Sequence, residues 1–303
     1  MTAYWRLARP RGMAWVAAVP LVGFGYAHWE RALQVRNGWA MLGVYLAWLF
    51  LHVGTMWMNS ALDEDEGEVL YGAAVAIPPR LGVAALSALV ASVVIAFVAH
   101  PLAGATALGC AIMAVLYSHP QTAFKGHSTL GPMVNLLGYG VLSPIAGFVL
   151  VEEAPTVRAA LALSLVVFWV FGAYFAAQAF QQKEDEDRGY QTYVVVYGPI
   201  ACLRTARACL NGALFILVLL AVLGWLPRAA LFSVPAFWLV DRWMALWEQQ
   251  PGGGSESWAR GMVQRLLLAG MVLLLSLYAH YFWQLVHGLP VAGLGTAVVP
   301  PGL

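Results

Sequence analysis

The feature that most constrains this chain is the length of its apolar stretches. Residues 81–99, 159–179 and 262–286 each run for about the 20 largely apolar residues that a helix needs to cross a bilayer core. Only 10% of the residues are charged, whereas a soluble domain carries about 25%. The sequence therefore predicts an all-α membrane protein surrounded by membrane lipids, and no nucleic-acid partner is expected.

Charged, proline-containing and glycine-rich breaks divide the chain into about nine spans. Their approximate limits are 12–28, 38–58, 79–99, 102–118, 131–151, 159–179, 208–224, 229–247 and 263–286. No linker is long enough to separate two soluble domains. Residues 1–303 are therefore expected to form a single polytopic domain, a bundle of transmembrane helices.

The Lys and Arg residues indicate the orientation of these spans, because positively charged loops are retained in the cytoplasm. If the N-terminus is inside, the inner face receives Arg6, Arg9, Arg11, Arg80, Lys125, Lys183, Arg188, Arg204, Arg207, Arg242, Arg260 and Arg265. The outer face then receives only Arg31, Arg36, Arg158 and Arg228. Twelve cations against four favour an N-terminus in the cytoplasm. The inner ends of the second and sixth spans then face the cytoplasm too.

Nine of the fifteen acidic residues gather in two short segments. The first, residues 63–68, follows Asn59 at the inner end of the second span. The second, residues 184–187, follows Gln181 at the inner end of the sixth span. Their equivalent positions in two hairpins favour one site built from two similar halves. A solvated charged loop is the alternative interpretation of either segment taken alone.

The spacing of these polar residues fits a site for a divalent cation. Asn59 and Asp63 lie four residues apart and share a helical face, with Glu66 about one turn further on. Gln181 and Asp185 repeat this spacing. Mg²⁺ binds one or two carboxylates and fills its other positions with water and substrate phosphates. The predicted ligands of a magnesium ion that bridges a diphosphate are Asn59, Asp63, Glu66, Gln181, Glu184 and Asp185.

Both segments resemble motifs of the UbiA superfamily of intramembrane prenyltransferases. The first is similar to N-D-x-x-D-x-x-x-D, with Asn59 and Asp63 in the pattern. The second is similar to D-x-x-D-D-x-x-x-G followed by Thr, and here reads Gln181, Glu184, Asp185, Gly189 and Thr192. Further matches are Arg9-Pro10, the loop from Tyr117-Ser118 through Pro120 to Lys125, and the V-x-x-x-G of residues 194–198. The resemblance thus extends from residue 9 to about residue 200.

This resemblance implies a nine-helix bundle that binds an isoprenyl diphosphate, with the head group at magnesium and the tail among the helices. The implied reaction is ionisation to an allylic cation at the cytoplasmic mouth, followed by prenylation of an aromatic or other lipophilic acceptor. Asp63, Asp185 and Lys125 are then the expected catalytic residues. The expected diphosphate-binding residues are Asn59, Lys125, Arg188, Gln181 and Tyr117.

The chain departs from the family pattern at three positions. Ser60 and Gly67 stand where the first motif has Asp, and Gln181 stands where the second motif begins with Asp. An acid among residues 65–68 is a candidate to replace the first-motif carboxylate. A neutral amide oxygen coordinates a metal more weakly than a carboxylate does. We therefore expect a divergent member of the family, with an altered metal affinity or substrate class.

Two alternatives remain open at this point. A terpene cyclase of the UbiA type would use the same diphosphate site without an acceptor. A transporter or cation channel would instead line its path with ionisable residues. The spans contain few such residues, and the most prominent are Asp241 and Arg242, which we interpret as a structural pair.

Overall fold

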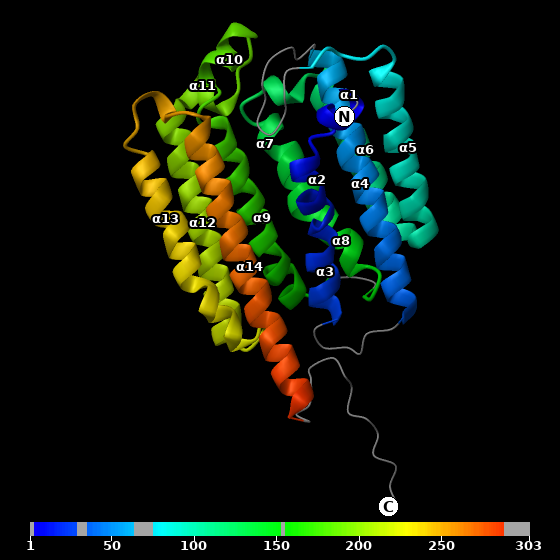
Figure 1. Ribbon diagram of the computed structural model, residues 1–303, viewed down its shortest axis with the longest axis vertical. Helices are drawn as coiled ribbons and strands as arrows, with labels where there is room; N and C mark the ends of the chain where they lie inside the picture. The colour runs from blue at the N-terminus through cyan, green and yellow to red at the C-terminus, as the bar shows by residue number, and fades with distance from the viewer. Residues whose placement is uncertain (1–2, 29–34, 64–74, 153–154, 288–303) are drawn as a thin grey trace, which may run out of the picture.

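The protein is a bundle of long helices that run along one axis (Figure 1). The computed structural model describes residues 3–28, 35–63, 75–152 and 155–287. In chain order the bundle contains α2 (Pro10–Ala17) with α3 (Val19–His28), α4 (Val35–Asp63), α5 (Leu81–Ala99), α6 (Pro101–Ser118), α7 (Leu130–Asn135) with η2 (Leu136–Leu142) and α8 (Ser143–Phe148), α9 (Val157–Gln178), α12 (Pro199–Val222), η3 (Arg228–Ser233) with α13 (Val234–Trp247), and α14 (Glu256–Val286). No strand forms within these described ranges, and the predicted all-α fold is confirmed.

Seven segments of the described chain are long and apolar enough to cross a membrane: α4, α5, α6, α9, α12, η3 with α13, and α14. Two broken segments, α2–α3 and α7–η2–α8, occupy the places of the first and fifth predicted spans. Large apolar side chains cover the outer face of α5, where Val83 is 66% and Val98 is 84% exposed. Such a surface requires lipid rather than water. The chain is therefore a multi-pass integral membrane protein, and its described crossing segments agree with the predicted nine.

The fifth crossing segment contains a π-helical turn, η2. The backbone N–H of Ser143 donates to the carbonyl oxygen of Gly138, five residues back. The Ser143 hydroxyl also donates to this oxygen, at 2.7 Å, and accepts a 2.8 Å hydrogen bond from the indole of Trp48. Such side-chain bonds support irregular backbone where no water is available. The turn thereby sets the direction of the helix face that carries Asn135 and Tyr139, which point into the interior of the bundle.

Helices α3 and α8 cross where both have a glycine. A Cβ at Gly23 would overlap the carbonyl oxygen of Pro144, and a Cβ at Gly147 would overlap that of Pro20. Small residues let helix backbones approach closely in membranes, where packing replaces the hydrophobic effect as the driving force. This crossing holds the first crossing segment against the fifth.

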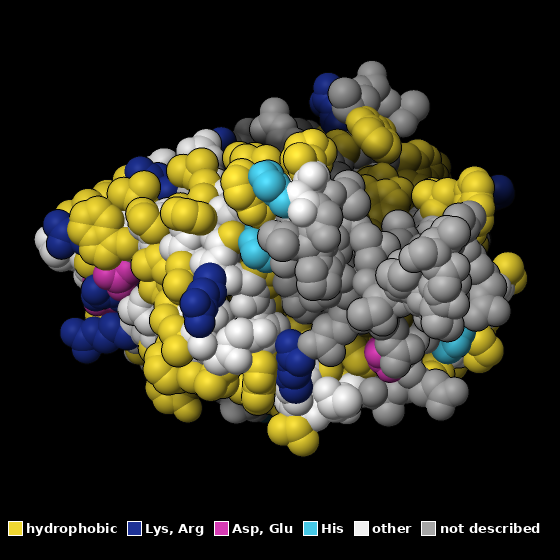
Figure 2. Space-filling view, turned by 90° about the horizontal axis from the view of Figure 1, so that it is seen from below, with side chains coloured by type: hydrophobic (Ala, Val, Ile, Leu, Met, Phe, Trp, Pro, Cys, Tyr) yellow, Lys and Arg dark blue, Asp and Glu magenta, His cyan; other side chains and the backbone are white. Residues whose placement is uncertain are grey.

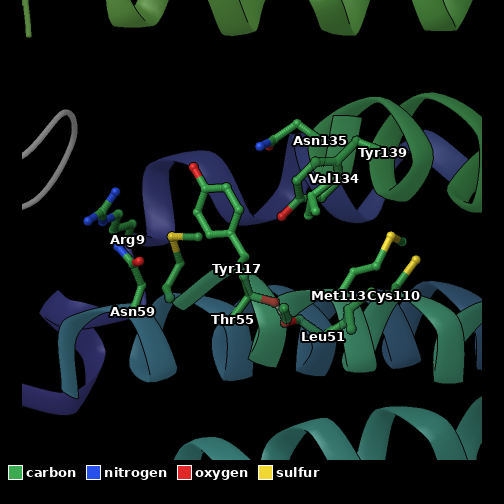
Figure 3. Close-up of a pocket in the computed structure, with 12 residues that line it drawn as sticks. Arg9, Leu51, Thr55, Asn59, Cys110, Met113, Tyr117, Val134, Asn135 and Tyr139 are labelled. Carbon is green, nitrogen blue, oxygen red and sulfur yellow. Dashed lines mark hydrogen bonds between the residues drawn. The ribbon is translucent and has the colours of Figure 1, made fainter. Parts of the chain in front are cut away.

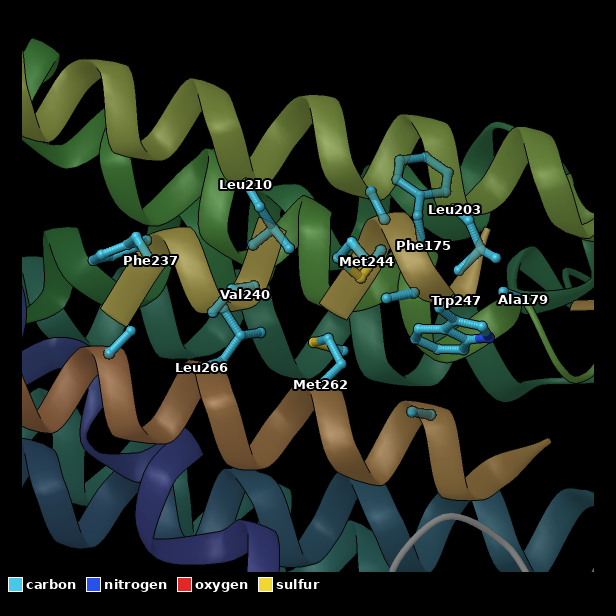
Figure 4. Packing of buried hydrophobic residues seen from close by; sticks show 14 of the residues in the cluster. Phe175, Ala179, Leu203, Leu210, Phe237, Val240, Met244, Trp247, Met262 and Leu266 are labelled. Carbon is cyan, nitrogen blue, oxygen red and sulfur yellow. The ribbon is translucent and has the colours of Figure 1, made fainter. Parts of the chain in front are cut away.

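Two apolar clusters stabilise the bundle. One joins α9, α12, α13 and α14 through large buried side chains, including Phe175, Leu203, Met244, Trp247 and Met262 (Figure 4). The other joins α4, α5, α6 and α8 around buried side chains that include Trp48 and Leu89. The candidate site described below lies beside the second cluster, at one end of the bundle.

Short helices gather at that end, near the start of the chain and the C-terminal end of α4 (Figure 1). They are α1 (Ala3–Leu7), η1 (Phe124–Gly126), α10 (Gln182–Asp187) and α11 (Tyr193–Tyr197). At the opposite end, the described surface shows many hydrophobic side chains, several Lys, Arg and His side chains and few acidic ones (Figure 2). The acidic residues of α10 therefore belong to the end where the short helices lie.

Three predictions about the helices need correction. The seventh and ninth spans begin at Pro199 and Glu256 rather than at residues 208 and 263, because charged residues in the first turns of each helix lower the hydropathy average there. The predicted pair of Asp241 with Arg242 is also wrong. Consecutive residues of a helix do not face each other. Asp241 instead pairs with Arg207 of α12, at 2.6 Å.

Candidate functional site

A cavity of about 170 Å³ opens among the start of α2, α4, α6 and α7–η2 (Figure 3). Its lining consists of Arg9, Leu51, Thr55, Met56, Asn59, Cys110, Met113, Ala114, Tyr117, Val134, Asn135 and Tyr139. Arg9 and Asn59 lie at one end of the cavity, and Met113 and Cys110 lie at the other (Figure 3). The cavity therefore has a polar head and a more apolar depth, which suits an amphiphilic ligand.

Asn59 reaches the polar end from the last turns of α4. Its side chain is half-buried, and its Oδ1 accepts a 3.2 Å hydrogen bond from the hydroxyl of Ser118 on α6. Asp63 is the final residue of α4, so the predicted helix does carry both residues. The side chain of Asp63 and the whole of Glu66 lie outside the described part of the chain. Their predicted contacts with a metal remain predictions.

Tyr117 belongs to a polar group between α6, α7 and α9. Its side chain interacts with Asn135 and Tyr174. Gln178, the last residue of α9, donates a 2.9 Å hydrogen bond from Nε2 to the Tyr174 hydroxyl and is only 7% exposed. Its Oε1 has no hydrogen-bond partner among the described residues. A buried acceptor without a partner is costly, which marks this corner as a place for a polar ligand or water.

The second acidic segment does not continue α9 as one helix. α9 ends at Gln178, and Gln181 is the N-cap residue of the separate helix α10. The backbone N–H of Asp185 still donates to the Gln181 carbonyl oxygen, at 3.0 Å, so these residues keep their one-turn relation. Glu184 is exposed and forms an ion pair with Arg188 at 2.9 Å. The one-turn spacing is thus confirmed, and α9 ends within one residue of the predicted limit of the sixth span.

Asp185 is held in place by the turn between α10 and α11. The hydroxyl of Thr192, which precedes α11, donates to Asp185 Oδ2 at 2.7 Å. The backbone N–H of Tyr190 donates to the Asp185 carbonyl oxygen at 2.9 Å. Burial raises the pKa of the Asp185 carboxyl, and the negative charge of Glu184 raises it further, against the effects of Thr192 and Arg188. A nearby cation would stabilise the ionised form.

Lys125 comes to this region on η1, in the loop that follows α6. The loop is docked by a 2.8 Å hydrogen bond from the Gln191 N–H to the Gly126 carbonyl oxygen. Lys125 is 8% exposed, and its Nζ lies 5.7 Å from the centre of the Tyr190 ring. Burial lowers the pKa of Lys125 to about 8, and the positive charge of Arg188 acts in the same direction. The structure therefore brings Lys125 and Arg188 together beside the Asp185 turn.

The described residues supply only part of the predicted metal site. No three His, Cys, Asp or Glu side chains of the described ranges converge on a point that could hold a metal ion. Among the predicted ligands, the structure describes the side chains of Asn59, Gln181, Glu184 and Asp185, and Glu184 pairs with Arg188. The side chains of the other two predicted ligands, Asp63 and Glu66, lie outside the described part of the chain.

Two residues of the site have roles that the sequence did not reveal. Arg9 was noted only as part of an Arg-Pro pair, yet it lines the cavity and adopts a left-handed backbone conformation, with φ 49°. Thr192 was noted only as a motif residue, and the structure gives it a direct hydrogen bond to Asp185. The available signal for Arg9 was its place in the Arg-Pro motif, but its conformation was not predictable, because proline favours an extended rather than a left-handed backbone in the residue before it.

The fold and the site define a multi-pass helical membrane protein with an amphiphilic cavity at its acidic end. The sequence matches the UbiA prenyltransferase family over residues 14–263. The chain belongs to this family, as its motifs predicted. A search of curated proteins finds no match to this sequence.

Solved structures share the fold over most of the chain. A UbiA homolog from Archaeoglobus fulgidus, bound to DMAPP and Mg²⁺, has a TM-score of 0.63 and 15% identity, covering 91% of this chain and 98% of that chain. A UbiA homolog from Aeropyrum pernix K1, in its apo form, has a TM-score of 0.62 and 15% identity, covering 86% and 96%. A structure of digeranylgeranylglyceryl phosphate synthase has a TM-score of 0.63 and 15% identity, covering 90% and 95%.

Proposed function

We propose that this protein is a magnesium-dependent enzyme that transfers an isoprenyl group from a prenyl diphosphate to a lipophilic acceptor. The observation that carries the proposal is the amphiphilic cavity, whose polar end holds Arg9 and Asn59. Membership of the UbiA prenyltransferase family supports the reaction class. A solved homolog bound to DMAPP and Mg²⁺ supports the type of substrate.

The diphosphate would bind among the cations at this end of the bundle. Lys125 and Arg188 are close enough for one charge to lower the pKa of the other. Like charges this close disfavour each other's charged form, although the Glu184 carboxylate already pairs with Arg188 at 2.9 Å. A diphosphate would add a further anion beside both cations, and hydrogen bonds between ionised partners are about twice as strong as neutral ones. Arg9 would add a third cation from the side of Asn59.

The residues present fit a magnesium ion. Asp185 has one carboxylate oxygen fixed by Thr192, while burial and Glu184 disfavour its charge in the absence of a cation. Asn59 and Gln181 would add neutral oxygen donors, with Asp63, Glu66 and Glu184 as the remaining predicted ligands. Magnesium, when bound, would neutralise the negative charge that develops on the leaving diphosphate.

The chemical step would take place where the polar end of the cavity meets its depth. The bond between the allylic carbon and the diphosphate oxygen breaks, and the diphosphate leaves with the electron pair. The acceptor then supplies the electrons of the new bond and loses a proton. Tyr117 and Tyr139 line this part of the cavity, and aromatic faces stabilise cations. Lys125 and Arg188 would hold the diphosphate away from the carbon that reacts.

The first test is binding of a non-hydrolysable farnesyl diphosphate analogue to the detergent-purified protein, with and without Mg²⁺. We expect binding that requires Mg²⁺ and that weakens at least about tenfold in Asp185→Asn, because a charged ligand of the metal is lost. Asp187→Asn is the matched control, since Asp187 is an exposed acid of the same helix. Its affinity for the analogue should stay within about twofold of wild type.

Two results would contradict the proposal. Wild type that fails to bind the analogue with Mg²⁺ present would exclude a prenyl diphosphate site. Equal effects of Asp185→Asn and Asp187→Asn would mean that α10 acts only through its overall negative charge. Once binding is established, a cyclic hydrocarbon formed from farnesyl diphosphate without acceptor would identify a cyclase in place of a transferase.

A further inference from the structure

We propose that α1 is a strap that positions Arg9 at the polar end of the cavity, with Trp57 and Tyr4 as the positioning residues. The inference rests on the proposed function, because it assigns Arg9 a contact with the diphosphate. The strap consists of Ala3–Leu7, which lies near the end of the bundle where the short helices gather (Figure 1). No motif of the sequence assigns a role to Trp57 or Tyr4.

Hydrogen bonds tie the strap to two separate elements. The indole Nε1 of Trp57 on α4 donates to the Tyr4 carbonyl oxygen at 2.9 Å. The hydroxyl of Tyr4 donates to the carbonyl oxygen of Pro79, just before α5, at 3.0 Å. The Tyr4 and Trp57 rings also meet edge to face, with centroids 5.5 Å apart. The strap is therefore fixed to the last turns of α4 and to the segment that precedes α5.

These bonds constrain the backbone that leads directly into Arg9. Leu7 and Ala8 are buried, at 6% and 1% exposure, and Arg9 then adopts φ 49°. A left-handed conformation is unfavourable for a residue with a side chain, and the following Pro10 narrows its choices further. Such a conformation persists where the surrounding structure holds it on both sides. Here the strap holds one side, and α2, which packs against α4, holds the other.

The geometry at Arg9 makes its position matter for a diphosphate. Its side chain lies beside Asn59 at the polar end of the cavity (Figure 3). A guanidinium is a rigid, planar fork that binds phosphate oxygens with two parallel hydrogen bonds. A rigid fork loses this match when its backbone moves, whereas a flexible ammonium would adjust. Loss of the strap should therefore weaken diphosphate binding specifically through Arg9.

A double-mutant cycle tests this coupling, with the farnesyl diphosphate analogue and Mg²⁺ as the probe. Trp57→Phe keeps a ring against Tyr4 and removes the indole donor, and we expect about three- to tenfold weaker binding. Arg9→Ala should weaken binding by about tenfold or more. In the Arg9→Ala background, Trp57→Phe should have no further effect, because the residue that it positions is gone. Trp5→Phe, on the exposed face of the strap, is the control.

Tyr4→Phe provides a second test of the strap. It removes only the hydroxyl that donates to the Pro79 carbonyl oxygen, so it should fold even if Trp57→Phe does not. It should weaken analogue binding in the wild-type background and not in the Arg9→Ala background. Equal weakening in both backgrounds, or unchanged binding in Trp57→Phe and Tyr4→Phe alone, would overturn the strap and leave the proposed function standing. Wild type that fails to bind the analogue would overturn the proposed function, and the strap with it.

Discussion

Lys125 on η1 and Arg188 at the end of α10 place two positive charges near each other in the candidate site. Lys125 is buried on a loop that docks beside the Asp185 turn, and its pKa is lowered to about 8 by burial and by Arg188. A lysine with this pKa is a mixture of charged and neutral forms in mildly alkaline solution. Its affinity for an anion should therefore depend on pH where an ordinary lysine would not.

We predict that binding of the prenyl diphosphate analogue weakens as the pH rises through 8. Only protonated Lys125 attracts the diphosphate, so affinity is full below the pKa and is lost above it. With a pKa of about 8, the dissociation constant should be about tenfold higher at pH 9 than at pH 7. Calorimetry across this range would also detect proton uptake on binding above pH 8, since the bound anion raises the lysine pKa.

Two variants separate Lys125 from other sources of pH dependence. Lys125→Arg should bind with little change between pH 7 and 9, because a guanidinium stays charged throughout. Lys183→Arg should keep the wild-type dependence, since Lys183 is an exposed lysine of α10. A wild-type slope in Lys125→Arg would assign the titration to another group.

At the scale of helices, the crossing of α3 and α8 leaves the least space for a side chain at any described glycine. Gly147→Ala would place a methyl group on the carbonyl oxygen of Pro20, which is backbone and cannot rotate away. We predict that this substitution destabilises the detergent-solubilised protein by about 3 kcal/mol, as overpacked interiors do. Thermal unfolding would detect it as a lower midpoint.

Gly25→Ala is the matched control for this prediction. Gly25 lies on α3 near Gly23, and a Cβ there would meet no atom within 4 Å. Alanine also favours helix over glycine, so Gly25→Ala should leave the midpoint unchanged or raise it. Equal midpoints for Gly147→Ala and wild type would mean that α3 and α8 separate without cost.

The sequence predicted which segments are helices better than where they begin. Apolar length identified the crossing segments, because a bilayer requires about 20 such residues whatever the tertiary structure. The sixth span was predicted to end at residue 179, within one residue of Gln178, but the seventh and ninth begin at Pro199 and Glu256 rather than at residues 208 and 263. Cys202, Leu203 and Ala259 of these early turns are buried in the cluster that joins α9, α12, α13 and α14. No local pattern contains that packing, so the first turns of α12 and α14 were missed.

The candidate site was predictable to the extent that it follows helical spacing and recognised motifs. Asn59, Tyr117 and Asp185 carry their polar groups on helices at the predicted end of the bundle. Arg9 depends on a left-handed backbone, and the pairing of Asp241 with Arg207 depends on how α12 meets α13. Both are consequences of tertiary packing, which spacing along one helix does not encode.

For the whole molecule, the described polar groups of the candidate site all lie at the end where α1, η1 and α10 gather (Figure 1). Arg158 and Arg228 begin the segments at the opposite end, as the charge distribution predicts. A charged diphosphate does not cross a bilayer unaided, so the side on which this end lies decides which pool of substrate the enzyme meets. The excess of cations predicts that this side is the cytoplasm.

Single-cysteine labelling would test this orientation. In a background with Cys110, Cys202 and Cys209 replaced by alanine, we expect an impermeant maleimide to label Arg228→Cys in sealed right-side-out vesicles and to spare Lys183→Cys. Both positions are exposed in the fold, so access to them differs only by the side of the membrane. Inside-out vesicles should give the reverse pattern. Labelling of Lys183→Cys from outside would place the acidic end outward. The twelve-to-four excess would then belong to the outer face, against the retention of positively charged loops in the cytoplasm.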